Sequence, residues 1–195
     1  MEILRGKDPI ELFEEWLSDA TNREINDPEA MSLATVDADG RPSVRMVLLK
    51  GVAKKGFSFY TNMESRKGAA LAAHPLAALC FHWKSLQRQV RVEGRVEILS
   101  SEDADAYFAT RHPLSRLGAW ASAQSRPLES RAILESRVEE YKEKFGLDIP
   151  RPPYWGGYLV VPDRIEFWQA GEGRLHDRFL FTMKKDEWDL QRLNP

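Results

Sequence analysis

The stretch Gln87–Leu99, which reads QRQVRVEGRVEIL, decides the fold of this chain. Val90 and Val92 alternate with charged neighbours, and this period of two is typical of a β-strand with one buried face. The apolar run Leu76–Trp83 precedes it and predicts another strand. The centre of the sequence therefore indicates a β-sheet.

The flanking sequence adds more strands, separated by turn signals and helices. Strands are expected at Met31–Val36, Val44–Lys50 and Gly56–Thr61, and again within Trp155–Leu193. The turn signal Asp37–Gly40 makes the first two a hairpin. Helices are expected at Pro9–Asp19, Ser65–Ala73, Ser101–Arg111, Ser115–Ser122 and Glu129–Phe145, the last with Ile133, Leu134, Val138 and Tyr141 on its apolar side.

Six or seven strands joined by short turns, with helices inserted between them, predict a mainly β fold with helical additions (α+β), arranged as an antiparallel barrel. The alternating order of a doubly wound sheet is not seen, and neither is a GxGxxG or Walker loop, which argues against a nicotinamide or nucleoside-triphosphate site. The length suits one domain, so we expect a single domain over residues 1–195 with a flexible start at residues 1–8.

Composition narrows the possible functions. A hydrophobic content of 43% argues against disorder, and a net charge of -2 gives no bulk attraction to nucleic acid or membranes. The single Cys80 excludes a disulfide framework within the chain and fits a reducing compartment, and the scattered histidines show no zinc spacing, so no metal is expected. Met1–Asp8 lacks the apolar core of a signal peptide, and we expect a cytoplasmic location.

The segment Arg174–Arg178, which reads RLHDR, crowds two guanidiniums, an imidazole and a carboxylate between an aromatic run and a strand-like run. Arginines are rarely crowded unless an anion shares the site. If the segment is extended, Arg174, His176 and Arg178 lie on one face. The alternative is a solvated hairpin end with one Asp–Arg pair.

Two further places gather cations earlier in the chain. Arg45 and Lys50 flank an apolar strand, which implies burial and hence a partner, although two solvated strand ends are the simpler alternative. Ser65–Lys67 stands at the start of an expected helix, where free amides, the helix dipole and two cations all favour a phosphate. A solvated basic turn explains the same residues equally well.

A second clamp for an anion is suggested by Tyr107 and Arg111, which are four apart on one expected helix and so share a face, and by Ser115 just beyond it. An ordinary helix surface is the alternative. Uncharged polar or aromatic groups suited to a heteroaromatic ring stand beside these segments, namely Gln89, Gln124, Ser125 and Trp168. Two anion-binding sites, with few acids or nucleophiles nearby, indicate that the protein binds a phosphorylated heterocyclic compound that itself supplies the chemical reactivity.

These segments, taken in order, resemble the pyridoxamine/pyridoxine 5'-phosphate oxidase family over nearly the whole chain. The resemblance rests on Arg45–Lys50, Tyr60-Thr61, Ser65–Lys67, Arg88–Val90, Gln124-Ser125, Phe167–Gln169, Arg174–Arg178 and Arg192–Pro195. The RLHDR segment and the terminal Arg-Leu-x-Pro pattern are its most specific parts. It implies an FMN-binding split barrel and a homodimer with FMN in clefts between the subunits.

The resemblance also implies a role for each matching residue. The flavin would be held by Arg45, Met46, Val47, Leu48, Leu49, Lys50, Tyr60, Thr61, Arg66, Lys67, Gln89, Gln124, Ser125, Trp168 and Arg178. Of these, Arg66 and Lys67 would take the flavin phosphate. The substrate phosphate would be taken by Lys50, Tyr107, Arg111 and Ser115, while Arg174 and His176 would be the catalytic residues over the pyridine ring.

The sequence departs from the family pattern at its start. Longer family members carry a basic, tyrosine-containing segment there that closes over the substrate, whereas Met1–Lys7 contain no tyrosine. Either this lid is absent, or the chain is truncated, or Arg5 takes part of its role. Ala170 also stands where a glycine is common in the family.

The resemblance implies oxidation of pyridoxamine or pyridoxine 5'-phosphate to pyridoxal 5'-phosphate, with O2 as electron acceptor and H2O2 as a product. One alternative is another flavin-dependent reductase or oxidase on the same barrel. A non-catalytic carrier of flavin or pyridoxal phosphate is another. A second phosphate clamp at Tyr107, Arg111 and Ser115 favours the oxidase, because a general flavin reductase does not need one.

Overall fold

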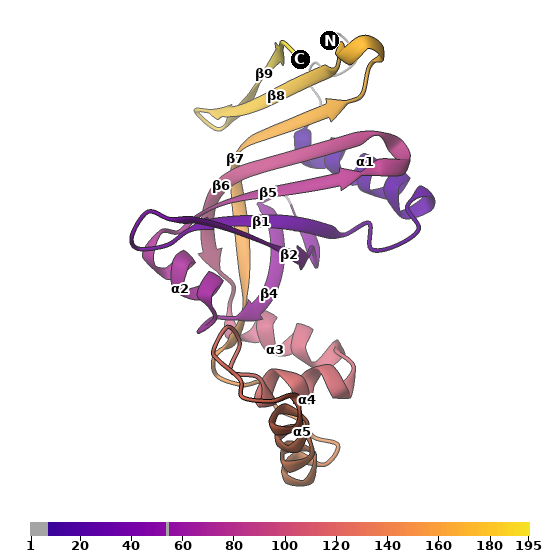
Figure 1. Ribbon diagram of the computed structural model, residues 1–195. Helices are drawn as coiled ribbons and strands as arrows, with labels where there is room; N and C mark the ends of the chain where they lie inside the picture. The colour runs from indigo at the N-terminus through magenta and orange to yellow at the C-terminus, as the bar shows by residue number, and fades with distance from the viewer. Residues whose placement is uncertain (1–7, 54) are drawn as a thin grey trace.

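The computed structural model describes residues 8–53 and 55–195, and its framework is one nine-stranded antiparallel sheet (Figure 1). Hydrogen bonding orders seven strands as β2-β1-β5-β6-β7-β4-β3, and β8 and β9 extend the sheet from β7. The strands are β1 Ala30–Val36, β2 Pro42–Leu48, β3 Gly51–Ala53, β4 Gly56–Asn62, β5 Leu76–Trp83, β6 Arg88–Ile98, β7 Trp155–Gln169, β8 Asp177–Lys184 and β9 Glu187–Leu193. The expected antiparallel strands are confirmed, and β3 is an addition that the sequence pattern did not reveal.

The long strand β7 connects the two ends of the molecule. Its first half pairs with β4, its second half pairs with β8, and β6 pairs along most of its other edge. The register between β6 and β7 shifts at Glu93/Gly94, where a Cβ on Gly94 would lie 2.1 Å from the Val161 carbonyl oxygen. A bulge of this kind bends a strand and increases its twist, which lets the sheet curl.

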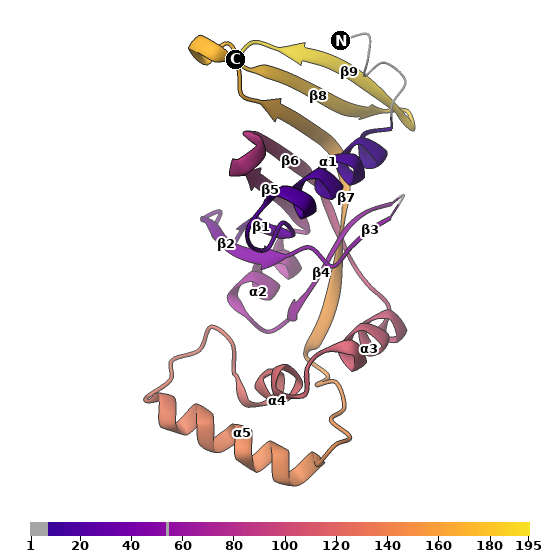
Figure 2. The same ribbon diagram turned by 90° about the vertical axis from the view of Figure 1, so that its right-hand side faces the viewer.

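Helix α1 (Pro9–Arg23) closes the core on one side of the curled sheet (Figure 2). Asp8 caps it by accepting a hydrogen bond from the Ile10 amide at 2.7 Å. The ring of Phe13 is fully buried and packs edge-on against Phe57 and Phe81, each at 4.8 Å between centroids. Such aromatic packing, with the apolar faces of β4 to β7, makes one continuous core.

The other helices are α2 Arg66–Ala73, α3 Ser101–Thr110, α4 Pro113–Ala121 and α5 Arg131–Phe145. Of these, α3, α4 and α5 lie at the end of the molecule opposite β8 and β9, whereas α2 lies nearer the middle, beside the sheet (Figures 1 and 2). The expected apolar side of α5 is only half-buried, because it packs mainly on Trp120 of α4, with Tyr141 at 5.5 Å and Phe145 at 5.1 Å between ring centroids. Among the described helices, none combines the length and apolar composition needed to cross a bilayer.

The expected burial of the strand from Val44 to Lys50 is wrong for three of its apolar side chains, although Leu49 is buried and Val47 is half-buried. Val44, Met46 and Leu48 are 68%, 63% and 41% exposed, because β2 lies at the edge of the sheet and, among the described strands, pairs with β1 alone. Arg45 alternates with them and is half-buried on the other face. A row of exposed apolar side chains is typical of a surface that contacts another protein.

Candidate functional site

Lys67 lies at the start of α2 and is almost fully buried, with 9% of its surface exposed. Its Nζ donates to the Gln124 Oε1 at 2.8 Å and to the Thr61 Oγ1 at 3.0 Å. A third hydrogen bond goes to the Oγ of Ser65, the N-cap residue of α2, at 3.2 Å. All three acceptors are neutral, so the ammonium is oriented but its charge is not compensated.

Two arginines share this region with Lys67, and we call Arg45, Arg66 and Lys67 the α2 cluster. Burial, and then the charge of Arg45, lowers the pKa of Lys67 to about 8. Burial also lowers the pKa of Arg45, and the charge of Arg66 adds to the effect. Across residues 8–53 and 55–195, no carboxylate forms an ion pair with any of the three.

Arg45 is held in place by uncharged groups as well. Its Nη1 donates to the Leu33 carbonyl and to the Thr35 Oγ1, each at 2.9 Å, and its guanidinium also contacts Ser43. Arg45 and Lys67 are therefore held in place by neutral groups, and Arg66 lies near enough for its charge to act on Arg45. Because like charges repel, such a cluster favours binding of an anion, and a helix N-terminus adds amides and a favourable dipole.

A second unsatisfied cation lies close by at Arg111. Its guanidinium stacks over the ring of Trp155 at 4.8 Å, and its Nη1 is buried without a hydrogen-bond partner. Burial lowers the pKa of Arg111. Arg111 and Ser115 line a cavity of about 220 Å³ together with Thr61 and Gln124, which also hold Lys67. The two cationic sites are therefore adjacent but separate.

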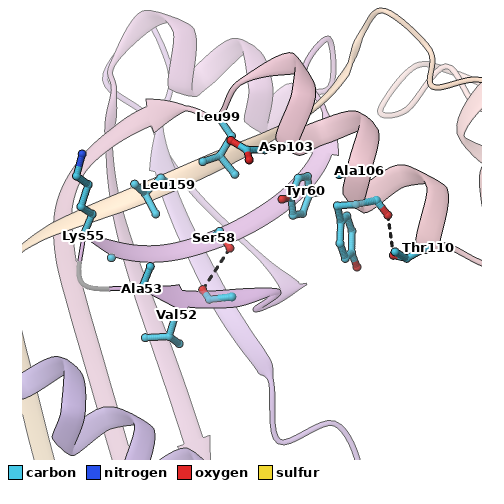
Figure 3. A pocket seen from close by; sticks show the side chains of 13 residues that line it. Val52, Ala53, Lys55, Ser58, Tyr60, Leu99, Asp103, Ala106, Thr110 and Leu159 are labelled. Carbon is cyan, nitrogen blue, oxygen red and sulfur yellow. Dashed lines mark hydrogen bonds between the residues drawn. The ribbon is translucent and has the colours of Figure 1, made fainter.

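Tyr107 lies near Arg111, although the two are not both inside one helix. Helix α3 ends at Thr110 and Arg111 is its C-cap with extended backbone, yet the Tyr107 ring stacks on Trp155 at 6.2 Å between centroids and Arg111 lies over the same ring. Tyr107 also stacks on Tyr60, with 4.1 Å between ring centroids, and lines a larger cavity of about 660 Å³ between β4 and α3 (Figure 3). Tyr60 lines both this cavity, with Tyr107, and the smaller one that Arg111 lines.

Charges at the other end of the molecule are arranged in the opposite way. Glu166 of β7 is 4% exposed, and Arg178 of β8 donates to it twice, from Nε at 2.8 Å and from Nη2 at 3.1 Å. Arg91 of β6 donates to the same carboxylate. Burial alone would raise the pKa of Glu166, but the hydrogen bonds and charges of the two arginines outweigh it and lower the pKa. We call Arg91, Glu166 and Arg178 the β8 cluster.

The expected extended conformation from Arg174 to Arg178 is wrong. Glu172–Arg174 form a short 3-10 turn in which Gly173 and Arg174 have φ of 60° and 66°, and β8 begins only at Asp177. A Cβ on Gly171 would lie 2.1 Å from the Leu175 carbonyl oxygen, so the turn closes tightly on a glycine. The simple alternation of side chains therefore does not apply to this segment.

Within the turn, His176 is fixed by its neighbours. Its Nδ1 accepts a hydrogen bond from the Gly171 amide at 3.2 Å, and its ring lies 4.7 Å from that of Trp168. With Nδ1 used as an acceptor, the neutral tautomer of the ring has its N–H on Nε2, which is then the available donor. The remaining member of this end, Gln89, is paired with Trp168 in the sheet register.

The structure thus divides the predicted site residues into two groups. Arg45, Tyr60, Thr61, Arg66, Lys67, Tyr107, Arg111, Ser115 and Gln124 form the first, and Gln89, Trp168, Arg174, His176 and Arg178 form the second. Among the hydrogen bonds, ion pairs and ring contacts of the described residues, none joins the two groups. Met46 shares a cavity of about 450 Å³ with Gln89.

The other predicted residues are less informative in one chain. Lys50 has an exposed side chain and its amide donates to the Ser58 carbonyl at 2.9 Å. Val47 and Leu48 belong to the edge strand, Leu49 is buried, and Ser125 is exposed with a φ of 71°. Sequence reasoning missed Glu166, although a carboxylate inside the aromatic run Ile165–Gln169 was a usable signal.

Models of known protein families match most of the chain. Residues 17–145 match the family described as pyridoxamine 5'-phosphate oxidase, and residues 155–195 match the C-terminal dimerisation region of pyridoxine 5'-phosphate oxidase. The pyridoxine/pyridoxamine 5'-phosphate oxidase of Cupriavidus taiwanensis is 57% identical over 189 residues, covering 96% of this chain and 89% of that protein. The protein of the same name from Rhodospirillum rubrum is 56% identical over 201 residues and both chains are covered completely.

Solved structures agree on the fold. PhzG from Burkholderia lata, in complex with tetrahydrophenazine-1-carboxylic acid, superposes with a TM-score of 0.93 at 30% identity, covering 98% of this chain and 94% of that one. A pyridoxamine 5'-phosphate oxidase-related, FMN-binding protein from Nostoc punctiforme has a TM-score of 0.78 at 19% identity, covering 97% and 100% of the two chains, and shows the fold alone.

The expected split-barrel fold, the oxidoreductase class and FMN as the cofactor are confirmed by these matches. The match to a dimerisation region supports a homodimer, in keeping with the exposed apolar row on β2. Because one family profile covers most of the chain and relatives above 50% identity cover nearly all of it, the chain belongs to the pyridoxamine 5'-phosphate oxidase family.

Proposed function

We propose that this protein oxidises pyridoxamine 5'-phosphate and pyridoxine 5'-phosphate to pyridoxal 5'-phosphate, with O2 as electron acceptor. Oxidation removes two electrons and two hydrogens, one from the exocyclic carbon and one from its oxygen or nitrogen, and O2 gains them to form H2O2. With the amine, water then hydrolyses the resulting imine, so that the aldehyde forms and ammonia leaves. The observation that carries the proposal is the presence of two adjacent cationic sites, the α2 cluster and Arg111, neither of which has a carboxylate partner among the described residues.

The α2 cluster fits the phosphate of FMN. Lys67 and Arg66 stand at the N-terminus of a helix, Arg45 adds a third charge, and the hydroxyl groups of Thr61 and Ser65 keep Lys67 in place. A dianionic phosphate would relieve the mutual repulsion of these cations. When bound, the flavin supplies the two-electron chemistry, and the protein's part is to position and neutralise.

Arg111 fits the phosphate of the substrate. Its Nη1 is a buried donor without a hydrogen-bond partner, and a phosphate oxygen would supply the acceptor. Ser115 lines the same cavity of about 220 Å³. We assign Tyr107 and Lys50 to the same phosphate by family resemblance. Gln124, which lines this cavity and also accepts from Lys67, would keep the two phosphates apart.

The second group of residues completes the site from the partner subunit. Because no hydrogen bond, ion pair or ring contact of the described residues joins the two groups, we place FMN in clefts between the subunits of a homodimer, with Gln89, Trp168 and Arg178 of one subunit facing the α2 cluster of the other. The backbone and side chains of Met46–Lys50, together with Tyr60 and Ser125, would line the same cleft. The dimerisation match at residues 155–195 contains Trp168 and Arg178, which supports this arrangement.

Arg174 and His176 would act on the pyridine ring. A guanidinium near the ring favours its electron-rich forms. Because Nδ1 of His176 already accepts from the Gly171 amide, its Nε2–H would be the group that donates a hydrogen bond to the substrate. Both groups orient the substrate for transfer of hydrogen from its exocyclic carbon without bonding to that hydrogen.

We expect one FMN-binding domain over residues 1–195, and the cytoplasmic location of the protein stays a prediction.

The test is an assay of the purified yellow protein with pyridoxamine 5'-phosphate and with pyridoxine 5'-phosphate, following pyridoxal 5'-phosphate and H2O2 together. We expect both products in a one-to-one ratio. Flavin binding without turnover of either substrate would indicate a carrier. Turnover of tetrahydrophenazine-1-carboxylic acid alone, the compound bound to the structurally similar PhzG, would indicate a different oxidase on the same barrel.

A further inference from the structure

Glu166 has no place in the function proposed so far, yet it is among the few buried charged residues of the described chain. Its two oxygens receive Nε and Nη2 of Arg178, which is the side-on, two-point contact of a guanidinium with a carboxylate. Arg91 approaches the same carboxylate from the neighbouring strand. Glu166 therefore holds Arg178 in one orientation.

The backbone near the end of the chain completes this hold. Nη1 of Arg178 donates to the Asn194 carbonyl oxygen at 2.9 Å, and Arg178 is paired with Leu193 across β8 and β9. Arg192 of the same segment forms an ion pair with Asp177 at 3.2 Å. The terminal Arg-Leu-x-Pro pattern thus braces the start of β8, where Arg178 lies.

These contacts leave Arg178 with a limited set of donors. A guanidinium carries five N–H groups, and Glu166 and Asn194 engage three of them, so one N–H remains on each terminal nitrogen. The Arg178 side chain is 27% exposed, so part of it reaches the surface beside its register partner, Trp168. Its charge is already balanced by a carboxylate, unlike that of Lys67.

We propose that Glu166 is a positioning residue for the flavin, which holds Arg178 so that its free N–H groups donate to an uncharged acceptor, the carbonyl oxygens of the flavin ring, rather than to a phosphate. This rests on the proposed placement of FMN between subunits. Stability alone does not account for Glu166, because buried ion pairs are often no more stabilising than apolar residues of the same size. The lowered pKa of Glu166 keeps the carboxylate ionised at neutral pH.

The test compares FMN with riboflavin, which has the ring but no phosphate. In flavin-free protein, Glu166→Gln is expected to lower the affinity for FMN and the affinity for riboflavin by the same factor, about tenfold. The reason is that a neutral amide cannot fix the Arg178 guanidinium at two points. Glu166→Asp should recover part of the loss. The matched control is Glu97→Gln, which removes a carboxylate from an exposed ion pair with Arg95 on the same sheet and should leave both affinities unchanged.

The outcomes separate a positioning role from a structural one. Combining Glu166→Gln with Arg178→Ala should weaken riboflavin no further than Arg178→Ala alone, and an additive loss would overturn the proposal. A loss confined to FMN, or unchanged affinities for both ligands, would also overturn it. If Glu166→Gln does not fold, Arg178→Lys tests the same point, because it removes the fork but keeps the charge, and unchanged riboflavin affinity would then contradict the proposal.

These titrations do not depend on turnover. If the wild-type protein binds FMN but oxidises neither pyridoxamine nor pyridoxine 5'-phosphate, the proposed reaction fails while the role of Glu166 is still measured.

Discussion

The α2 cluster and the β8 cluster both gather cations, but only the second contains a carboxylate. Lys67 and Arg45 are surrounded by neutral oxygens, and burial lowers their pKa values. Arg178 is paired with Glu166, and its pKa is raised by that hydrogen bond. The comparison shows that crowded cations alone do not identify an anion site. The absence of a counter-ion among the described residues is the more specific sign, and on this basis we propose the α2 cluster as the phosphate site.

The largest effect is expected from removing the central charge of the α2 cluster. Lys67→Ala should weaken FMN binding by about 3–5 kcal/mol, the range for loss of one partner from a buried, hydrogen-bonded charge pair. Fluorescence titration of flavin-free protein measures this directly. Lys142→Ala, which removes an exposed lysine paired with Glu139, is the control and should bind FMN normally. A loss below tenfold for Lys67→Ala would remove the distinction between the clusters.

Removing the neighbouring cation should affect the substrate instead. Arg111→Ala is expected to weaken binding of pyridoxamine 5'-phosphate by roughly 2–4 kcal/mol while FMN stays bound, because the two sites share Gln124 but not their charges. Steady-state kinetics and the flavin content of the purified variant provide the two readouts. Arg131→Ala on the exposed face of α5 is the matched control. Equal loss of flavin and substrate would show that the sites are not separate.

The turn next to the β8 cluster should influence turnover more than flavin binding. Arg174→Ala is expected to lower kcat/KM by a factor that corresponds to about 2 kcal/mol of lost transition-state stabilisation. His176→Asn should cost about 1 kcal/mol on the same scale, since asparagine retains a neutral hydrogen bond. Arg178→Ala should instead lower the affinity for FMN. Measuring FMN affinity and peroxide formation for all three variants checks the order. Flavin loss in Arg174→Ala with retention in Arg178→Ala would reverse the two roles.

The smallest effect is a pH dependence that belongs to the α2 cluster alone. Lys67 loses its charge as the pH rises through about 8, and a bound phosphate favours the charged form. FMN binding therefore takes up a proton above this pH, and affinity should fall by up to about tenfold for each pH unit, while riboflavin affinity stays flat. Lys67→Met should remove the slope. A slope of equal size for riboflavin would assign the pH dependence to another group.

Sequence patterns predicted the strands and the cations but not the contacts that separate the two clusters. Alternation around Val90 and Val92 marks β6 correctly, and Ser65 caps α2 as its position suggests. The hydrogen bond from Lys67 to Gln124 joins residues 57 positions apart, which no local pattern encodes. The turn at Gly173–Arg174 depends on left-handed backbone that an alternating pattern conceals.

The edge strand β2 shows the same limit. Its apolar residues predict burial, but in the described part of this chain Val44 and Met46 are left uncovered. Sequence hydrophobicity reports that a face should be covered and not which chain covers it. The first residues, 1–7, with the question of a lid and of Arg5, lie outside the described residues.

The most direct test of the phosphate assignment is the affinity of the unmodified, flavin-free protein for FMN and for riboflavin under the same conditions. Because the two ligands differ only in the phosphate, their ratio measures what the α2 cluster contributes. We predict that FMN binds at least about 100-fold more tightly than riboflavin at pH 7, as expected for a phosphate that meets uncompensated, partly buried cations. Equal affinities would contradict the assignment of the α2 cluster to the flavin phosphate.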